Sequence, residues 1–208
     1  LILLQPDFGS GLVMVCSIVI MVLAADSPLS YFVRVGILGA GGLGGLILSA
    51  PYRLARITSF IDPWKDPLGA GFQIIQSLFA IAPGGILGVG FDNSMQKHFY
   101  LPEPQTDFIF AIYAEEFGFI GSVLLIGLFI AVIYQGVKIA KNCTDPYLCY
   151  IAIGLTSLFA IQVMINLGVV VGLFPVTGIT LPFISYGGSS LMVMMGSMGL
   201  LMSIAKES

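Results

Sequence analysis

Residues 117–137 read FGFIGSVLLIGLFIAVIYQGV, and this uncharged segment decides the fold class. A helix needs about 20 apolar residues to cross a bilayer, and the segment supplies 21. The rest of the chain suits the same environment. Only 9 % of its residues are charged, against about 25 % in soluble domains, and its mean hydropathy is +1.01. We therefore predict an all-α fold, a polytopic transmembrane helix bundle.

Four more apolar segments predict further spans, which gives five in a single membrane domain covering residues 1–208. The other four are residues 8–25, 31–50, 148–173 and 189–204. The chain opens with Leu1 rather than Met, so we expect it to be the C-terminal part of a longer protein. The net charge of −3 is small and gives no indication of nucleic acid binding, and three scattered cysteines predict neither a disulfide framework nor a metal site.

Basic residues of the short connections orient the bundle, because cytoplasmic segments are enriched in Lys and Arg. If the spans alternate in direction, these residues share one side: Arg34, Lys138, Lys141 and Lys206. Segments 1–7 and 174–188, which fall on the opposite side, contain no Lys or Arg. The large loop 51–116 is therefore expected on the extracytoplasmic side.

Loop 51–116 holds eleven of the nineteen charged residues of the chain. Ionisable groups are costly inside a bilayer, so their concentration in one loop marks a candidate functional region. Within the loop, residues 71–82 are uncharged but too few to span. They predict a re-entrant or interfacial helix, and the glycines that follow suit irregular backbone beside a cavity.

Asp107 is the strongest candidate for chemistry in this loop. Pro104 excludes helix at Glu103, and an apolar helical pattern begins soon after, which predicts Asp107 in the first turn of the next helix. There the helix dipole favours the ionised carboxylate, which could accept a proton or bind a cation. The alternative is that Asp107 only caps this helix, a common role for Asp. Glu115 and Glu116 are expected to pair with a basic residue or to mark the membrane interface.

Two further polar pairs lie in the C-terminal third. Ser189 and Ser190 begin the last predicted helix, where free N–H groups suit an anion or the serines cap the helix. Gln162 and Asn166 are four residues apart on one helix face. They fit interhelical hydrogen bonding, or else a polar transport path.

Six motifs together make the sequence resemble the SEDS family of bacterial cell-wall proteins, named for shape, elongation, division and sporulation. They are QPDFG at 5–9, PYRLARITSF at 51–60, DPWKDP at 62–67, GFQIIQS at 71–77, YLPEPQTDFIF at 100–110 and LPFISYGGSS at 181–190. The forms of the third and fifth motifs resemble the FtsW/SpoVE branch of Gram-positive bacteria more than the RodA branch.

The resemblance implies a membrane glycosyltransferase of about ten helices, of which this chain would hold the last five. Such an enzyme polymerises lipid II, the lipid-linked disaccharide-peptide, with release of undecaprenyl pyrophosphate. The family's essential loop aspartate falls on Asp107 and its loop-entry arginine on Arg53. Other basic site residues of the family would lie in the N-terminal half, outside this chain.

The implied reaction inverts the configuration at C1 of the donor sugar, so one carboxylate near the attacking hydroxyl suffices as general base. The pyrophosphate leaving group needs positive charge nearby. Asp107 is the candidate base, and its rival role is to hold a divalent cation, Mg or Mn. The remaining candidates for substrate contacts follow from position: Arg53, Arg56 and Lys97 for phosphate, Glu103, Gln105 and Thr106 beside Asp107, and Ser189 and Ser190.

The resemblance also implies partners and a location. The partners are lipid II, the nascent glycan strand, membrane lipids, a class B penicillin-binding protein transpeptidase, and other division or sporulation membrane proteins. The location is the bacterial cell membrane, with the active face outside and a place at the septum. Two other functions stay open, a lipid II flippase and a non-catalytic membrane scaffold.

Overall fold

The computed structural model describes residues 8–25, 59–69, 71–94 and 105–207, together with the single residues 28, 30, 34, 36, 39 and 41. In these parts every regular element is a helix. The elements are α1 (Phe8–Ala24), the 3-10 turn η2 (Pro63–Lys65), α4 (Phe72–Gly84), α6 (Ile109–Asn142), α7 (Pro146–Val170) and α8 (Gly188–Glu207). Among the described helices, α6, α7 and α8 are long and apolar enough to cross a membrane.

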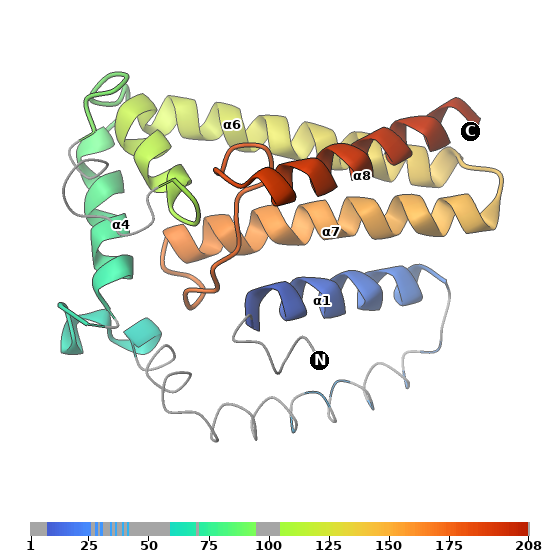
Figure 1. Ribbon diagram of the computed structural model, residues 1–208, viewed down its shortest axis with the longest axis horizontal. Helices are drawn as coiled ribbons and strands as arrows, with labels where there is room; N and C mark the ends of the chain where they lie inside the picture. The colour runs from blue at the N-terminus through green and yellow to red at the C-terminus, as the bar shows by residue number, and fades with distance from the viewer. Residues whose placement is uncertain are drawn as a thin grey trace.

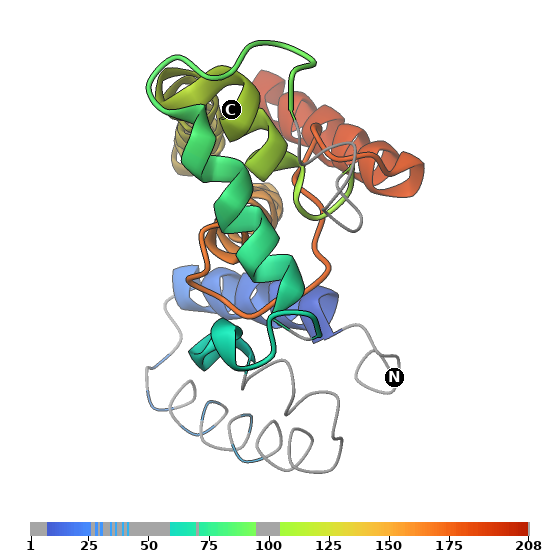
Figure 2. The ribbon, with the colours of Figure 1, turned by 90° about the vertical axis from the view of Figure 1, so that its left-hand side faces the viewer.

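Four helices run alongside one another, and α4 lies across one end of them (Figures 1 and 2). Helix α7 is central and contacts α1, α6 and α8. Its start is fixed by Asp145, whose carboxylate accepts a hydrogen bond from Tyr147 N–H at 2.9 Å, and by a proline in the first turn. This cap ends the short connection from α6, so that α6 and α7 pack as antiparallel neighbours.

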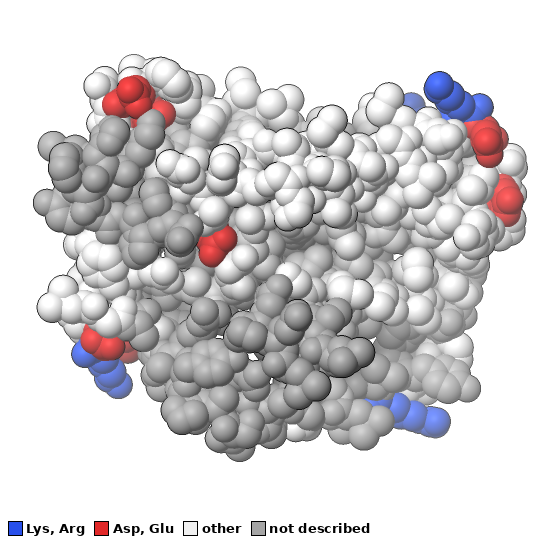
Figure 3. All heavy atoms as spheres, in the orientation of Figure 1, with Lys and Arg blue, Asp and Glu red and all other residues white. Residues whose placement is uncertain are grey.

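Apolar side chains fill the centre of the bundle and also cover its outside. Phe129 of α6 and Phe159 of α7 meet in the core with ring centroids 6.0 Å apart. Close approach is possible at Gly136, where an added Cβ would overlap the side chain of Thr156 on α7. Leu124 and Met192 expose 60 % and 75 % of their surface, which fits contact with lipid. On the face seen in Figure 3, described charged groups lie toward the two ends of the helices, with an uncharged band between.

Four of the five predicted spans coincide with helices. Segments 8–25, 148–173 and 189–204 correspond to α1, α7 and α8, and 117–137 falls within α6. The span at 31–50 lies outside the described residues, except for single helical positions. The expected short helix at 71–82 is α4, and Ser77 Oγ ties it to α7 by donating to Val170 O at 2.7 Å.

Helix α6 is longer than expected because it begins at Ile109 and continues through an irregular residue, Gly118. Gly118 has φ 65° and ψ −162°, so α6 is two helical segments joined at this break. Segment 85–90 bonds to both sides of it: Val89 N–H to Glu115 O (3.0 Å), Gly90 N–H to Glu116 O (3.1 Å), Phe119 N–H to Gly85 O (2.9 Å) and Ile120 N–H to Ile86 O (3.2 Å). The chain following α4 thus satisfies backbone groups that the break leaves free.

Glu115 anchors the end of this segment from inside the protein. Its side chain is 2 % exposed, and Oε2 accepts a hydrogen bond from Ser94 Oγ at 2.5 Å. Glu116 is also buried. This contact of Glu115 is to a neutral hydroxyl, and the expectation that the two acids pair with a basic residue or mark the membrane interface stays a prediction. The two acids lie in the packed junction between α4 and α6, and their backbone carbonyls bind Val89 and Gly90 of the segment that follows α4.

Candidate active site

Asp107 lies in the turn 105–108 that leads into α6, and its side chain is half-buried. The N-cap residue of α6 is Phe108, and no acidic residue occurs in the first turn. The expectation that Asp107 belongs to the first helical turn is therefore wrong. Phe108 is 1 % exposed, so its burial in the core sets where the helix begins. Because dipole effects fall off within the first turn, they give Asp107 less support than expected.

Three consecutive carbonyls of this turn are hydrogen bonded to groups that come much later in the sequence. The bonds are Tyr186 N–H to Gln105 O (2.7 Å), Ser185 Oγ to Thr106 O (2.5 Å) and Asn166 Nδ2 to Asp107 O (2.8 Å). The turn that carries the candidate base is thereby held against the end of α7 and the loop 171–187.

The loop 171–187 wraps around Asp107 on the side of Gly178. A Cβ added to Gly178 would lie 3.6 Å from Asp107 Oδ2, and the φ of Gly178 is +75°, which favours glycine. Further along the loop, Ser185 Oγ accepts a hydrogen bond from Leu181 N–H at 2.7 Å. Leu181 is 1 % exposed and anchors this part of the loop in the core.

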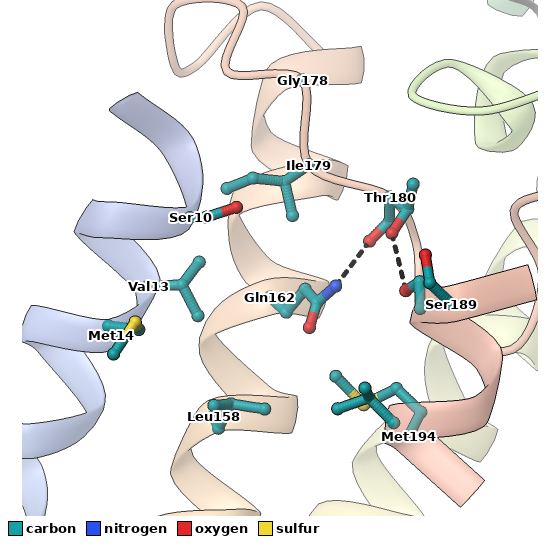
Figure 4. Close-up of a pocket in the computed structure, with 12 residues that line it drawn as sticks. Ser10, Val13, Met14, Leu158, Gln162, Gly178, Ile179, Thr180, Ser189 and Met194 are labelled. Atoms are coloured by element: carbon teal, nitrogen blue, oxygen red, sulfur yellow. Dashed lines mark hydrogen bonds between the residues drawn. The ribbon is translucent and has the colours of Figure 1, made fainter. Parts of the chain in front are cut away.

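A pocket of about 430 Å³ begins at Gly178 and extends between α1, α7 and α8 (Figure 4). Its end near the loop is polar. There Gln162 Nε2 donates to Thr180 O at 3.1 Å, and the hydroxyls of Thr180 and Ser190 are 3.0 Å apart. Its other end is apolar and is formed by these residues: Val13, Met14, Leu158, Val193 and Met194. The pocket therefore changes from polar to apolar along the helices, and Gly178 at its polar side lies near the Asp107 carboxylate.

The structure brings part of the expected site together. Gln105, Thr106 and Asp107 form one turn, and Ser189 and Ser190 line the adjoining pocket at the start of α8. Four expected site residues lie outside the described residues: Arg53, Arg56, Lys97 and Glu103.

Sequence reasoning missed how two amides of α7 act. Gln162 and Asn166 were expected to form hydrogen bonds between helices or to line a polar transport path, but both donate to loop carbonyls. The reason is their position in the last turns of α7, directly beneath the loop 171–187. Their spacing placed both on one face, but only the fold shows that the face meets Thr180, Ile179 and Asp107. Ser185 and Gly178 were missed as well, because nothing local in the sequence pairs them with Asp107.

Few of the described side chains near Asp107 could bind a divalent cation. Among the described residues, no three His, Cys, Asp or Glu side chains gather in a way that could hold a metal. Mg²⁺ is commonly bound through one or two carboxylates together with substrate phosphates. Asp107 alone fits that mode only with a phosphate-bearing substrate in place.

Comparison with known proteins places the whole chain in one family. Residues 1–208 match the model of the FtsW/RodA/SpoVE family, described as cell cycle protein. The chain is 55 % identical over its full length to stage V sporulation protein E of Bacillus subtilis, covering 57 % of that protein. It is 46 % identical to a probable peptidoglycan glycosyltransferase FtsW of Coxiella burnetii, covering 56 % of it. The chain therefore spans a little over half the length of these curated relatives.

Solved structures show the same fold. One is described as structural coordination of polymerization and crosslinking by a peptidoglycan synthase complex. It matches 99 % of this chain and 57 % of its own with a TM-score of 0.76 and 34 % identity. The rod shape determining protein RodA of Thermus thermophilus matches 99 % of this chain and 52 % of its own, with a TM-score of 0.64 and 28 % identity.

Proposed function

The chain belongs to the FtsW/RodA/SpoVE family of cell cycle proteins, and from this we propose that it forms the catalytic half of a peptidoglycan glycosyltransferase. The substrate would be lipid II and the products a glycan strand and undecaprenyl pyrophosphate. One observation carries the proposal: the Asp107 carboxylate lies near Gly178, a lining residue of a pocket that has a polar and an apolar end. A lipid-linked sugar has the same division into a polar and an apolar part.

In the proposed reaction, Asp107 acts as the general base. It takes the proton from the acceptor sugar hydroxyl as the hydroxyl oxygen forms a bond to C1 of the donor sugar. The bond between C1 and the pyrophosphate oxygen breaks, and both electrons leave with undecaprenyl pyrophosphate, so the configuration at C1 inverts. The developing charge on the leaving group requires cations. Arg53, Arg56 and Lys97 are proposed for this role, with contributions from the N-terminal half of the full-length protein.

A divalent cation, Mg or Mn, is the second proposed role for Asp107. Asp107 would be the residue of this chain that holds the ion, which would supply positive charge to the leaving group. The half-buried Asp107 side chain and the fixed backbone around it suit either role. Replacing Asp107 by Glu distinguishes them, since a changed preference among divalent ions would favour the cation role.

The setting of this reaction is also proposed from the relatives. The chain is part of a multi-pass membrane protein, and the proposed active face is extracytoplasmic, at the septum. A class B penicillin-binding protein transpeptidase is the proposed partner, because a solved structure with the same fold is described as coordinating polymerization with crosslinking. The proposed role is in cell division or sporulation, because the similar proteins include FtsW and stage V sporulation protein E.

Strand synthesis by the purified full-length protein tests the proposal against its alternatives. We expect lipid II in detergent or in vesicles to be converted to glycan strands of increasing length, read by gel electrophoresis. A lipid II flippase would instead move a fluorescent lipid II between leaflets without forming strands. A scaffold would do neither, and either of these results would refute the glycosyltransferase.

The apolar end of the pocket predicts a dependence on the lipid chain. Val193 lines the pocket on α8, and its replacement by Trp would fill part of the apolar end. We expect the KM for lipid II to rise about tenfold, which is roughly 1.4 kcal/mol of binding, with a smaller rise for an analogue with a shortened lipid. The measurement is initial-rate kinetics with both substrates. Val123→Trp on α6 is the matched control, because Val123 is 51 % exposed and does not line this pocket.

A further inference from the structure

Asn166 is the most deeply buried polar group that contacts the candidate site. Its side chain is 1 % exposed and sits in the last turns of α7. Its Nδ2 donates two hydrogen bonds, to Asp107 O at 2.8 Å and to Ile179 O at 2.7 Å. Both amide hydrogens are therefore used, and each goes to a backbone carbonyl of a different loop.

The orientation of this amide is fixed by its partners. Turned the other way, Oδ1 would face two carbonyl oxygens and could accept from neither. In the orientation found, Oδ1 is buried and has no hydrogen-bond partner among the described residues. A buried acceptor without a partner is unfavourable, so the favourable part of the arrangement is the pair of bonds made by Nδ2.

Those two bonds join two segments that lie near the Asp107 carboxylate. One holds the backbone of Asp107 itself. The other holds Ile179, the neighbour of Gly178, where an added Cβ would lie 3.6 Å from Asp107 Oδ2. A shift of either segment would change the distance from the carboxylate to the polar end of the pocket. Asn166 connects both to a transmembrane helix, which is more rigid than either loop.

We propose that Asn166 is a positioning residue that holds the Asp107 carboxylate near Gly178, at the pocket. Ser185 supports the same turn from the loop side through Thr106 O. This inference deepens the proposed glycosyltransferase function, because the expected effect of Asn166 on the reaction rate rests on that function. The expected effect of Asn166 on the backbone does not rest on it. A misplacement of about 1 Å in a catalytic group can lower a rate about 100-fold.

The test uses the full-length protein in lipid nanodiscs and two variants, Asn166→Ala and Asn166→Leu. If both of these fold poorly, Ser185→Ala is used as a milder variant. The matched control is Ser157→Ala. Ser157 is buried on the same helix, but its hydroxyl donates to Gly154 O of that helix at 2.9 Å. Two measurements are made on each variant, the steady-state kinetics of strand synthesis and backbone hydrogen exchange by mass spectrometry.

We expect kcat to fall between 10-fold and 100-fold while KM for lipid II changes by less than about threefold. Exchange should rise in peptides covering 105–108 and 178–187, above all at the Tyr186 N–H that bonds to Gln105 O, while α6 and the middle of α7 stay protected. Ser157→Ala should match the wild type in both measurements.

The two measurements separate failure of this inference from failure of the proposed function. Unchanged exchange in both peptides would overturn the positioning role, whatever the activity. A rise in KM with kcat unchanged would overturn it too, because that pattern indicates a binding contact. If exchange rises as expected but the wild-type protein makes no strands, the role of Asn166 in holding the two segments stands and the glycosyltransferase proposal fails.

Discussion

Replacing Asp107 by Asn in the full-length protein is expected to abolish glycan-strand synthesis while leaving the fold intact. The fold should survive because the bond from Asn166 goes to the backbone carbonyl of residue 107, which the substitution keeps. Asn has nearly the same shape as Asp but cannot take a proton or supply a negative charge. A general base contributes about 10²–10⁴-fold in rate, which is roughly 3–5 kcal/mol. Strand synthesis from lipid II, measured beside lipid II binding, should show loss of the first with the second retained.

A true helix cap provides the control for this experiment. Asp145 caps α7, with its carboxylate accepting from Tyr147 N–H. Asn is an equally good cap, so Asp145→Asn should leave both stability and strand synthesis near wild type. If Asp107→Asn behaves in the same way, Asp107 is a structural residue and the chemistry lies elsewhere. The position of Asp107 before the N-cap Phe108 already makes a capping role less suitable than the sequence suggested.

Helices at four of the predicted spans could be located from the sequence because lipid imposes one strong constraint on it. A helix facing hydrocarbon must be apolar over its length, so α7 and α8 are readable from composition alone. The start of α6 was not readable in this way. Glu115 and Glu116 suggested the end of the membrane segment at residue 117, yet both are buried against protein within α6. Hydropathy cannot distinguish an acid buried in protein from an acid in water.

The candidate site was predictable only where chemistry is local. Asp107 stood out through its motif, and Ser189 and Ser190 through their place at a helix start. The groups that hold Asp107 were not predictable, because Asn166 and Ser185 are distant in sequence and act on backbone carbonyls. A carbonyl has no sequence signature, so a side chain that binds one looks like any other buried polar residue.

Replacing Gly118 by Ala is expected to destabilise the junction between α4 and α6 severely. The φ and ψ of Gly118 fall in a region that is essentially restricted to glycine, and strained backbone of this kind costs about 1–3 kcal/mol per residue. An added Cβ would also overlap the backbone of Gly88 and Ile86. Relief of that overlap would break bonds between segment 85–90 and α6. We expect a total loss of about 3 kcal/mol or more, seen as a lower Tm and faster proteolysis of the outer loop.

Gly127→Ala is the matched control because Gly127 lies in the same helix and an added Cβ there would meet no atom within 4 Å. Alanine is the better helix former by about 0.8–1.0 kcal/mol, so this change should leave the Tm equal or slightly higher. Equal Tm values for the two variants would refute the close packing at Gly118. If the packing is as described, Gly118→Ala should also reduce strand synthesis, because the first part of α6, residues 109–117, follows Asp107 directly and is held by that junction. The helix break at Gly118 is thus expected to control both the packing of segment 85–90 against α6 and the position of the Asp107 carboxylate.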